Sequence, residues 1–379
     1  MKVQQLLYEQ NRWSVLSDDS VNQPQLVLFF CSAQLCREQN PWRLLQQCFP
    51  NACITGLSTG GEILGDEVFD NTIAAVAIEF EYSHVQLAST LIEDPSQSTQ
   101  QAQHLVSQLP QEHLKLVWLL SDGLLVNGSE LINGCRQILP EHVLLTGGLA
   151  GDAADFNQTY VSANSTARSG QLAAIGFYGA QLEVGWGSMG GWDNFGPKRM
   201  ITRAKDNVLY ELDGQPALEL YKRYLGENAQ QLPGSALLFP LTIRHPDEEN
   251  TALVRTILSV DENDSSMTFA GNVPQGYVAQ LMRGNFDHLI EGAAQAAEAA
   301  QQDPPDTTLA LLVSCIGRKL LMGQQVADEV EVVADILGPH TKLAGFYSYG
   351  EIAPDVFSQH CELHNQTMTI TTISEKADA

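Results

Sequence analysis

The stretch Gly345-Phe346-Tyr347-Ser348-Tyr349-Gly350-Glu351-Ile352 decides how this chain folds, because its pattern occurs more than once. The same frame, with glycine first, a hydroxyl residue fourth and Gly-Glu-Ile at the end, occurs in Gly56-Leu57-Ser58-Thr59-Gly60-Gly61-Glu62-Ile63. A looser third version, one residue shorter and ending in Asp, is Thr146-Gly147-Gly148-Leu149-Ala150-Gly151-Asp152. Three copies at wide spacing predict a repeated structural unit.

Each of these glycine turns lies between two apolar runs that have the length and composition of buried strands. The predicted unit is therefore strand, helix, glycine-acid turn, strand. Three such units indicate an α/β fold of the mixed α+β kind, with mixed sheets. The runs before the turns are 26–30, 116–120 and 309–313, and those after them are 73–78, 172–177 and 368–372.

The length of 379 residues is large for a single hydrophobic core, so we expect two domains. A polar tract at 227–234 indicates a domain boundary in that region. Pro216 is expected to start the short helix that precedes this tract, and we place the second domain's first residue there. We predict domains at 1–215 and 216–379, which meet near residues 215–230.

The net charge of −25, from 20 basic and 45 acidic residues, argues against nucleic acid as a partner, because such a field repels phosphate. An acidic surface more simply means solubility. No window approaches the roughly 18 apolar residues of a membrane-spanning helix. The first 25 residues lack the apolar core of a signal peptide. We therefore expect a cytoplasmic protein without a membrane partner.

The seven cysteines are an odd number without regular spacing, which indicates reduced thiols rather than a disulfide framework. Cys31 and Cys36 do not form a CxxC pair, so a structural zinc site is not expected.

The segment 184–197 has the most unusual composition in the chain, with five glycines between aromatic residues. We expect a loop here whose backbone can approach a ligand or a neighbouring segment closely. Trp186 and Trp192 are then candidate contacts to a cofactor. The alternative is a turn between domains that the aromatic side chains hold in place.

Five motifs occur along the chain in an order that resembles the FIST family of sensory proteins, which have an N-terminal and a C-terminal FIST domain. The resemblance extends from about residue 25 to 375. Its motifs are the front Gly-Glu-Ile turn, the segment 146–152, Ser314-Cys315-x-x-Arg318, the segment 345–352, and His364-Asn365-x-Thr367.

The resemblance implies two FIST domains that sense a small molecule in signal transduction. One bacterial branch of free-standing FIST proteins binds haem, senses nitric oxide and signals to a partner histidine kinase. This chain is similar to that branch in length and in carrying no fused output domain. The resemblance thus implies haem b as cofactor and a histidine kinase as partner. One departure is Leu57, where many relatives have cysteine.

The carboxylates of Glu62, Asp152 and Glu351 each end a glycine turn, and we count them with Tyr349 as candidate ligand-binding residues. A carboxylate there can accept hydrogen bonds from a ligand amine or act as a general base. It can equally tie off its own turn through nearby backbone N–H groups. Repetition in three units favours the structural role, because a ligand site seldom needs three copies.

Cys315 and Arg318 follow a predicted strand and are further candidates for ligand binding. A thiolate at Cys315, with its pKa lowered by Arg318, would be a nucleophile and would make the protein a thiol-dependent enzyme. More often, a cysteine at a strand end is a small buried hydrophobe. We expect no enzymatic activity, partly because no glycine pattern matches a phosphate-binding loop.

A haem site needs an apolar cavity, an axial ligand and a basic group near the propionates. His288 is our first candidate for the axial metal ligand, because it lies on the first turn of a helix that Asn285 caps, where the helix dipole keeps imidazole neutral. His245, beside an arginine, is the second, and His364 is the third. Each of the three can also be a surface or packing histidine.

Two alternatives to a haem sensor remain open at this level. The first is a sensor of amino acids or related metabolites, held without haem by the turn carboxylates and arginines. The second is the thiol-dependent enzyme. We expect the ligand pocket near the domain seam or the glycine-tryptophan segment. A homo-oligomer also remains open, as do the identity of the kinase and the sign of its regulation.

Overall fold

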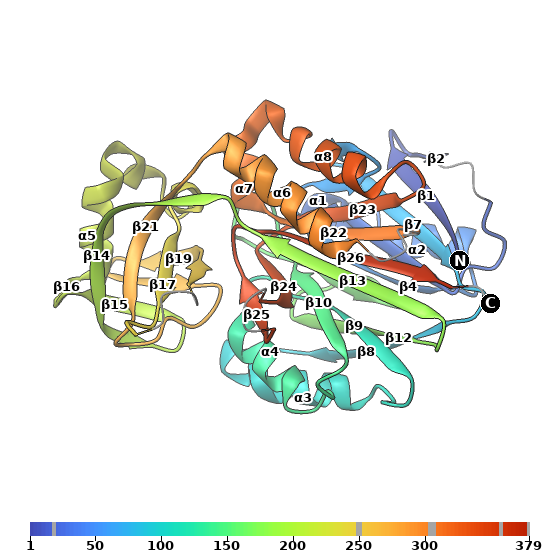
Figure 1. Ribbon diagram of the computed structural model, residues 1–379, viewed down its shortest axis with the longest axis horizontal. Coiled ribbons are helices and arrows are strands. Elements are labelled where there is room, and N and C mark those ends of the chain that lie inside the picture. Colours follow the sequence, from blue (N-terminus) through green and yellow to red (C-terminus); the bar gives the residue numbers. More distant parts are fainter. Residues whose placement is uncertain (17–19, 248–251, 302–307, 356–358, 377–379) are drawn as a thin grey trace.

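The apolar runs of the three repeated units form the central strands of three similar sheets. In this computed structural model, the three sheets and their helices make up a larger body, and residues 192–284 form a smaller one (Figure 1). The mixed α/β architecture that the pattern predicts is confirmed. The residues that the structure describes are 1–16, 20–247, 252–301, 308–355 and 359–376.

The first unit contributes a parallel pair of strands, β3 and β4, beside antiparallel strands. Its helices are α1 (Ala33–Glu38), which Ser32 caps, and α2 (Pro41–Cys48), which begins with proline after its cap, Asn40. The sheet runs in the order β11 (Val161–Ala163), β4 (Cys53–Thr59), β3 (Leu26–Ser32), β7 (Ile73–Glu79), β1 (Lys2–Glu9), β2 (Arg12–Val15).

The second unit has the same plan, with β9 and β10 as the parallel pair. Its helices are α3 (Ser98–Ser107) and α4 (Gly128–Arg136), and the side chain of Asn127 caps α4. The sheet runs in the order β25 (Cys361–His364), β24 (Gly350–Pro354), β10 (Leu144–Leu149), β9 (Leu114–Ser121), β12 (Gln171–Tyr178), β8 (His84–Leu91).

The third unit pairs β22 and β23 in parallel and carries three helices, α6 (Phe286–Ala300), α7 (Ile316–Met322) and α8 (Asp328–Leu337). Asn285 caps α6, which confirms the predicted helix start. The sheet runs in the order β13 (Leu182–Met189), β26 (Met368–Glu375), β22 (Leu309–Cys315), β23 (Lys342–Ser348), β5 (Glu62–Leu64), β6 (Glu67–Phe69).

The three units exchange strands in a ring. Strand β5 of the first unit pairs with β23 of the third, β24 of the third pairs with β10 of the second, and β11 of the second pairs with β4 of the first. Hydrogen bonds between the glycine turns close the same ring. They run from Gly60 N to Tyr347 O (2.7 Å), from Gly151 N to Ser58 O (2.9 Å), and from Tyr349 N to Leu149 O (3.3 Å).

The centre of the larger body, where the sheets meet, is filled by aromatic side chains. The ring of Phe30 stacks on Phe346 at 5.2 Å, and Trp118 lies edge-on to both, at 6.1 and 6.4 Å. Leu57 is fully buried in the same cluster. Because these side chains are closely packed against one another, their role is to stabilise the contact between the three sheets.

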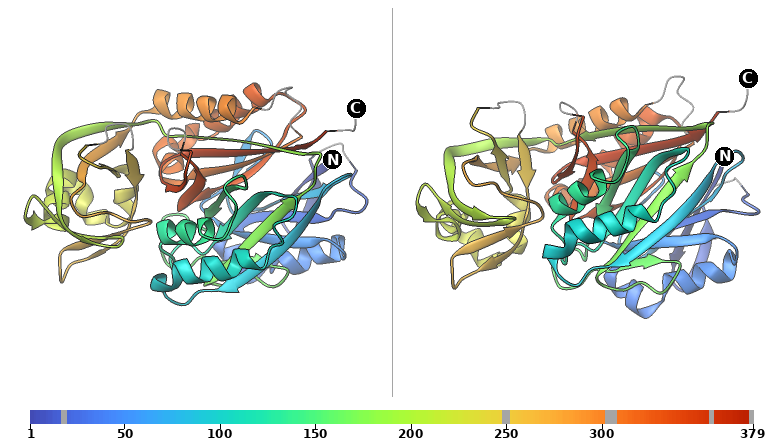
Figure 2. Two further views of the ribbon diagram at one scale, coloured as in Figure 1. Left: turned by 60° about the horizontal axis from the view of Figure 1, so that its bottom comes forward. Right: turned by 90° about the horizontal axis from the view of Figure 1, so that it is seen from below.

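The smaller body is built on one strongly bent sheet with its own core (Figure 2). Two connections join it to the larger body, at Gly190–Gly191 and at Gly284–Asn285. The expected seam at 215–230 lies inside this body. Its elements are β14 (Trp192–Lys205), β15 (Val208–Leu212), β16 (Gln215–Pro216), α5 (Ala217–Leu225), β17 (Leu241–Arg244), β18 (Leu253–Arg255), β19 (Ile257–Asp261), β20 (Ser266–Phe269) and β21 (Val278–Gly284).

The prediction of a loop over 184–197 is wrong, because this segment forms the end of β13 and the start of β14, interrupted only at Gly190–Gly191. The glycines of β13 let α6 cross the strand closely. A Cβ atom on Gly185 would lie 2.4 Å from the carbonyl oxygen of Ala300, and one on Gly187 would lie 2.0 Å from that of Ala296. Helix packing therefore explains these glycines.

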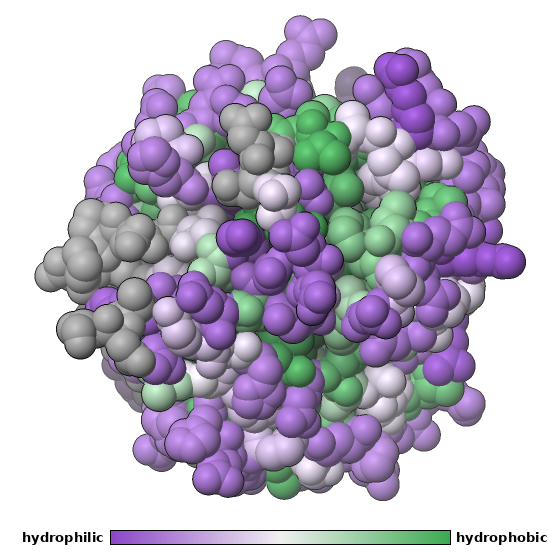
Figure 3. All heavy atoms as spheres, turned by 90° about the vertical axis from the view of Figure 1, so that its right-hand side faces the viewer, coloured by the Kyte–Doolittle hydropathy of each residue, from purple (hydrophilic) through white to green (hydrophobic). Residues whose placement is uncertain are grey.

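The surface at the end of the molecule where both termini lie is mostly hydrophilic, with apolar residues scattered among polar ones (Figure 3). This agrees with the excess of acidic residues in the sequence. Within the described ranges, no helix is both long enough and apolar enough to cross a membrane.

Candidate functional site

Glu62 fastens the first glycine turn to the strand that follows it. Its carboxylate accepts a hydrogen bond of 2.6 Å from the hydroxyl of Thr59 and bonds of 2.9 and 3.2 Å from the hydroxyl and N–H of Thr72. The side chain is fully buried. Burial raises the pKa of Glu62 to about 7. Both carboxylate oxygens are thus engaged by the protein itself.

Glu351 repeats this arrangement in the third unit. It accepts hydrogen bonds from the hydroxyl of Ser348 (2.5 Å) and from the hydroxyl and N–H of Thr367 (3.0 and 3.2 Å). Burial raises its pKa to about 8. In both units the carboxylate joins its glycine turn to the start of the next strand through hydrogen bonds within the protein, and neither carboxylate reaches the surface.

Asp152 has different partners. One of its oxygens accepts hydrogen bonds of 2.8 Å from the N–H groups of Asn157 and Gln158, and the other accepts one from the hydroxyl of Tyr349. The ring of Tyr349 also stacks on Phe156 at 4.8 Å. The structure therefore brings together two of the predicted ligand-binding residues, Asp152 and Tyr349, but they bond to each other and not to a ligand.

In the second unit, the carboxylate that accepts hydrogen bonds from the residue before the next strand is that of Asp122, which the sequence analysis missed. Its carboxylate accepts hydrogen bonds from the N–H of Leu124, Leu125 and Gly170 and from the hydroxyl of Ser169. Gly170 lies directly before β12, just as Thr72 and Thr367 lie before β7 and β26. A signal for this role was its position, immediately after a buried strand.

Arg318 is fully buried and forms an ion pair with Glu329 of α8, with nitrogen–oxygen distances of 2.8 and 2.9 Å. Its guanidinium also donates hydrogen bonds of 2.8 Å to the carbonyl oxygens of Gly190 and Leu289. These two carbonyls flank the connections to the smaller body. Arg318 thus fastens those connections to the larger body, and it faces none of the clefts described below.

Cys315 is completely buried, and burial raises its pKa well above the usual value for a thiol, with Glu351 adding to the effect. A nucleophilic role, which the sequence leaves open as the less frequent alternative, requires the opposite shift of this pKa. Arg318 does not produce that shift, because desolvation outweighs the influence of a guanidinium already paired with Glu329, and Cys315 is a small buried side chain at a strand end.

The three candidate histidines lie in three different places. His288 is half exposed on α6, with its Nδ1 3.1 Å from Oδ1 of Asp193. His245 is half-buried just beyond β17 and lies edge-on to Tyr277. His364 is on β25, where its Nε2 lies 3.1 Å from the carbonyl oxygen of Ala353, and burial lowers its pKa to about 4.

The two tryptophans lie on β13 and β14, on either side of Gly190–Gly191. Trp192 is buried with Leu289 and Met322 at the base of the smaller body. Trp186 is half-buried on β13. Within the described residues, no three His, Cys, Asp or Glu side chains gather in a way that could hold a metal ion.

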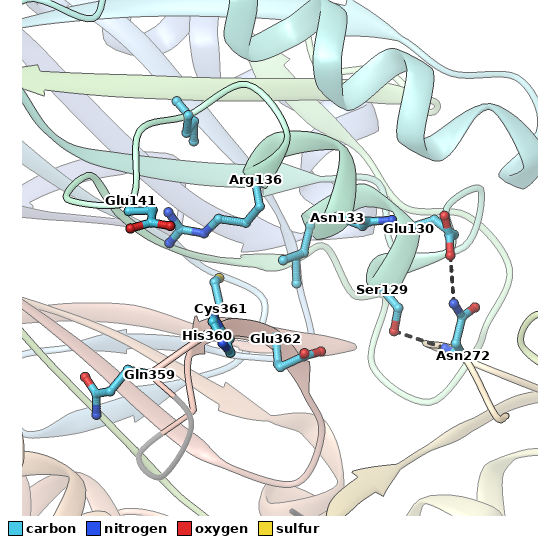
Figure 4. Close-up of a pocket in the computed structure, with 12 residues that line it drawn as sticks. Ser129, Glu130, Asn133, Arg136, Glu141, Asn272, Gln359, His360, Cys361 and Glu362 are labelled. Atoms are coloured by element: carbon cyan, nitrogen blue, oxygen red, sulfur yellow. Dashed lines mark hydrogen bonds between the residues drawn. The ribbon is translucent and has the colours of Figure 1, made fainter.

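A cleft of about 650 Å³ lies between α4, β25 and the smaller body. Figure 4 shows Arg136 and Glu141 along one wall, with Cys361 and Glu362 on the strand that faces them. Its size suits a small ligand. The lining residues are Ser129, Glu130, Ile132, Asn133, Arg136, Leu139, Glu141, Asn272, Gln359, His360, Cys361 and Glu362.

One end of the cleft is a contact between the two bodies. Asn272 of the smaller body donates to Glu130 (2.8 Å) through its amide and to Ser129 Oγ (3.0 Å) through its N–H (Figure 4). Behind it, the buried guanidinium of Arg255 donates to the carbonyl oxygens of Asn272 (3.0 Å) and Leu363 (2.9 Å). Burial lowers the pKa of Arg255 to about 10.

The cleft carries three carboxylates, those of Glu130, Glu141 and Glu362, and the single guanidinium of Arg136. Burial raises the pKa of Glu362. A second hollow of about 780 Å³, beside α2, is lined by amide, apolar and thiol side chains without an acidic or basic group. The cleft at α4 is the better candidate site, because charged groups converge in it.

Comparison with known protein families gives two matches, the FIST N domain over residues 25–215 and the FIST C domain over residues 217–354. The chain belongs to the FIST family. Curated proteins gave no match to this FIST protein. One solved structure that is similar to it is the crystal structure of cyanuric acid hydrolase from A. caulinodans. That chain is 10% identical, with a TM-score of 0.35, over 94% of this chain and 91% of the other, and such a likeness carries no argument about activity.

The three predicted histidines of this FIST protein do not fit a haem. The hollow beside His288 is only about 300 Å³, and its lining includes Glu291 but no lysine or arginine to meet a propionate. His364 directs Nε2 at a backbone carbonyl, and half-buried His245 does not line the cleft at α4 or the hollows beside α2 and His288. The cleft at α4 has the volume, an imidazole in His360 and a guanidinium in Arg136, but three carboxylates as well.

Proposed function

We propose that this FIST protein is a sensor that binds a small, polar, amine-bearing metabolite of the amino-acid class in the cleft between α4 and β25. FIST domains are associated with small-ligand sensing in signal transduction. The observation that carries the proposal is the convergence of three carboxylates and one guanidinium around a space of about 650 Å³.

The charges of the cleft suit a ligand with both an ammonium and a carboxylate group. Glu362 and Glu141 would accept hydrogen bonds from the ammonium, and Arg136 would hold the carboxylate through its planar donors. Hydrogen bonds to charged groups stabilise a complex by about 1.5–3 kcal/mol each. The proposed role is binding without catalysis.

Signal transmission would follow from the position of the cleft. Asn272 belongs to the smaller body, and Ser129 and Glu130 belong to the larger one, so a ligand at this end would touch both. Binding would then favour one orientation of the two bodies. A histidine kinase that contacts the smaller body would read that change, as the family resemblance implies.

The test is a thermal-shift screen of the full chain against the standard amino acids and diamines such as putrescine, followed by calorimetry on each hit. Arg136→Ala should weaken binding of an amino acid about tenfold or more, which is about 1.4 kcal/mol, and Glu362→Gln should weaken binding of any amine. Arg12→Ala, an exposed charge on β2, is the matched control and should change nothing. Equal binding by all three variants would place the ligand elsewhere.

The second candidate is the haem-based nitric oxide sensor that the resemblance implies. The observation that favours it is the presence of both His360 and Arg136 in the cleft, as axial ligand and propionate partner. Bound haem would supply an iron that takes up nitric oxide. The test is an absorption spectrum with hemin, before and after reduction and addition of the gas. A sharp Soret band that His360→Ala abolishes and His288→Ala preserves would support this candidate; a spectrum like that of free hemin would exclude it.

A further inference from the structure

Two buried thiols of the first unit are in direct contact. The Sγ atoms of Cys31, near the end of β3, and Cys36, in α1, lie 3.0 Å apart. Neither side chain reaches the surface appreciably. A disulfide has a sulfur–sulfur distance of about 2.0 Å, so a shift of about 1 Å would allow the bond to form.

We propose that Cys31 and Cys36 form a redox-active pair that closes to an intramolecular disulfide when the protein meets a peroxide. This modification site lies on the first sheet, away from the cleft at α4, and does not depend on the ligand that the cleft binds. Cys361 also lies near a second thiol, that of Cys135, and raises its pKa, but the Sγ of Cys361 donates to the carbonyl oxygen of Leu145 at 3.3 Å.

The local structure makes Cys36 more accessible to a peroxide than Cys31. Helix α1 has only six residues, and its outer face, with Gln34, Arg37 and Glu38, is exposed. So short a helix opens at low cost, since few hydrogen bonds hold it. Cys36 moves out with the helix, whereas Cys31 is held in a central strand between β4 and β7.

The chemistry needs only the two thiols and a peroxide. The thiolate of Cys36 attacks one peroxide oxygen, the O–O bond breaks, and a sulfenic acid forms as the first water leaves. The thiolate of Cys31 then attacks the sulfenic sulfur, the S–O bond breaks, and the second water leaves with the proton of Cys31. Two thiols lose two electrons and two protons in all, hydrogen peroxide is reduced to two waters, and a dithiol reverses the change.

The surroundings of Cys31 indicate that the reaction is slow and requires α1 to open. Burial raises the pKa of the Cys31 thiol well above its usual value, with neighbouring Cys36 and Glu62 adding to the effect. Little thiolate is therefore present while α1 is closed. The carbonyl oxygen of Cys31 also accepts a hydrogen bond from Thr59 (3.3 Å), so closure of the disulfide would act directly on the first glycine turn.

The experiment is peptide mapping of the intact native protein after treatment with hydrogen peroxide, alkylation in denaturant and digestion with trypsin. Both cysteines lie in one tryptic peptide, residues 13–37. We expect this peptide to be two hydrogens lighter and unalkylated, and to take two alkyl groups again after treatment with dithiothreitol.

Exposed Cys48, which lies outside the Cys31–Cys36 pair, provides the control. Cys48→Ser should leave the cross-link unchanged, whereas Cys36→Ser should abolish it, with native folding checked by circular dichroism. The proposal is overturned if peptide 13–37 stays fully alkylated while Cys48 is oxidised, or if it gains oxygen without losing two hydrogens. Because the readout is made on the unmodified chain, it does not depend on whether a variant folds.

Discussion

The hydroxyl of Tyr349 donates a hydrogen bond to Oδ1 of Asp152, and so joins the third glycine turn to the second across 197 positions of sequence. The same hydroxyl lies 3.1 Å from the carbonyl oxygen of Ala153. Burial and the Asp152 carboxylate both raise the pKa of Tyr349, so the phenol keeps its proton. This contact is one of the links that close the ring of three units.

Tyr349→Phe removes the donor and leaves a buried carboxylate oxygen with one partner fewer. We expect a loss of about 1.5–3 kcal/mol in the free energy of unfolding, since the acceptor is charged. Urea denaturation followed by circular dichroism measures it. Tyr277→Phe, at a half-buried position of the smaller body, is the control and should cost much less. Equal losses in the two variants would show that the Asp152 contact contributes nothing specific.

Arg318→Met should destabilise the protein by about 3–5 kcal/mol, because it leaves the buried carboxylate of Glu329 without its ion pair. Adding Glu329→Met should recover part of the loss, since it removes the stranded charge. The ion pair of exposed Arg203 with half-buried Glu211 offers the contrast. Arg203→Met should cost less than about 1 kcal/mol. The measurement is urea denaturation of these three variants and the natural chain. An equal cost at Arg318 and Arg203 would contradict the stabilising role of the buried ion pair.

Stability should fall as the pH rises from 6.5 to 8. Burial raises the pKa of Glu62 to about 7 and that of Glu351 to about 8, so the folded state holds protons that the unfolded state has already released. Each group lowers the free energy of unfolding by up to about 1.4 kcal/mol per pH unit in this window. Below about pH 6.5, His364 has the opposite effect on stability. Its pKa is lowered to about 4 in the folded state, so the unfolded state binds a proton that the folded state does not, and the free energy of unfolding falls as the pH falls.

The measurement is urea denaturation at several pH values between 6.5 and 8, for the natural chain and for Glu351→Gln. An amide cannot titrate, so the variant should show a clearly flatter dependence on pH. A slope that is the same in both chains would mean that Glu351 stays ionised in the folded state.

Gly187→Val should prevent α6 from packing on β13, since a Cβ atom there would lie 2.0 Å from the carbonyl oxygen of Ala296. We expect loss of the cooperative folded state, seen as missing soluble protein or a lowered melting temperature. Gly190→Ala is the matched control on the same segment, because its nearest neighbour would be 3.9 Å away. A stable Gly187→Val protein would show that the helix can move aside.

The repeated unit could be found in the sequence because its signals are local. Apolar strands, capped helices and a glycine turn are each written in a few adjacent residues, as in 345–352 and at Asn285. The same local character misled us at 184–197. Glycines that permit a helix to cross a strand look in sequence like glycines that form a loop.

The candidate site could be predicted only in part. The turn residues Glu62 and Glu351 were visible as a motif, but their hydrogen-bond partners Thr72 and Thr367 lie farther along the chain. The cleft was not visible at all, because its wall is assembled from three distant segments, around 129–141, 272 and 359–362.

By itself, the sequence determined the α/β class, the threefold repetition and the family, since these rest on short-range patterns of strands, caps and turns. The tertiary structure alone decided that the units exchange strands, that Arg318 and Cys315 are buried, and that Arg136 faces Glu362 across a cleft. The physical reason is that burial and pairing depend on which distant surfaces meet, and local propensity contains no information about that contact.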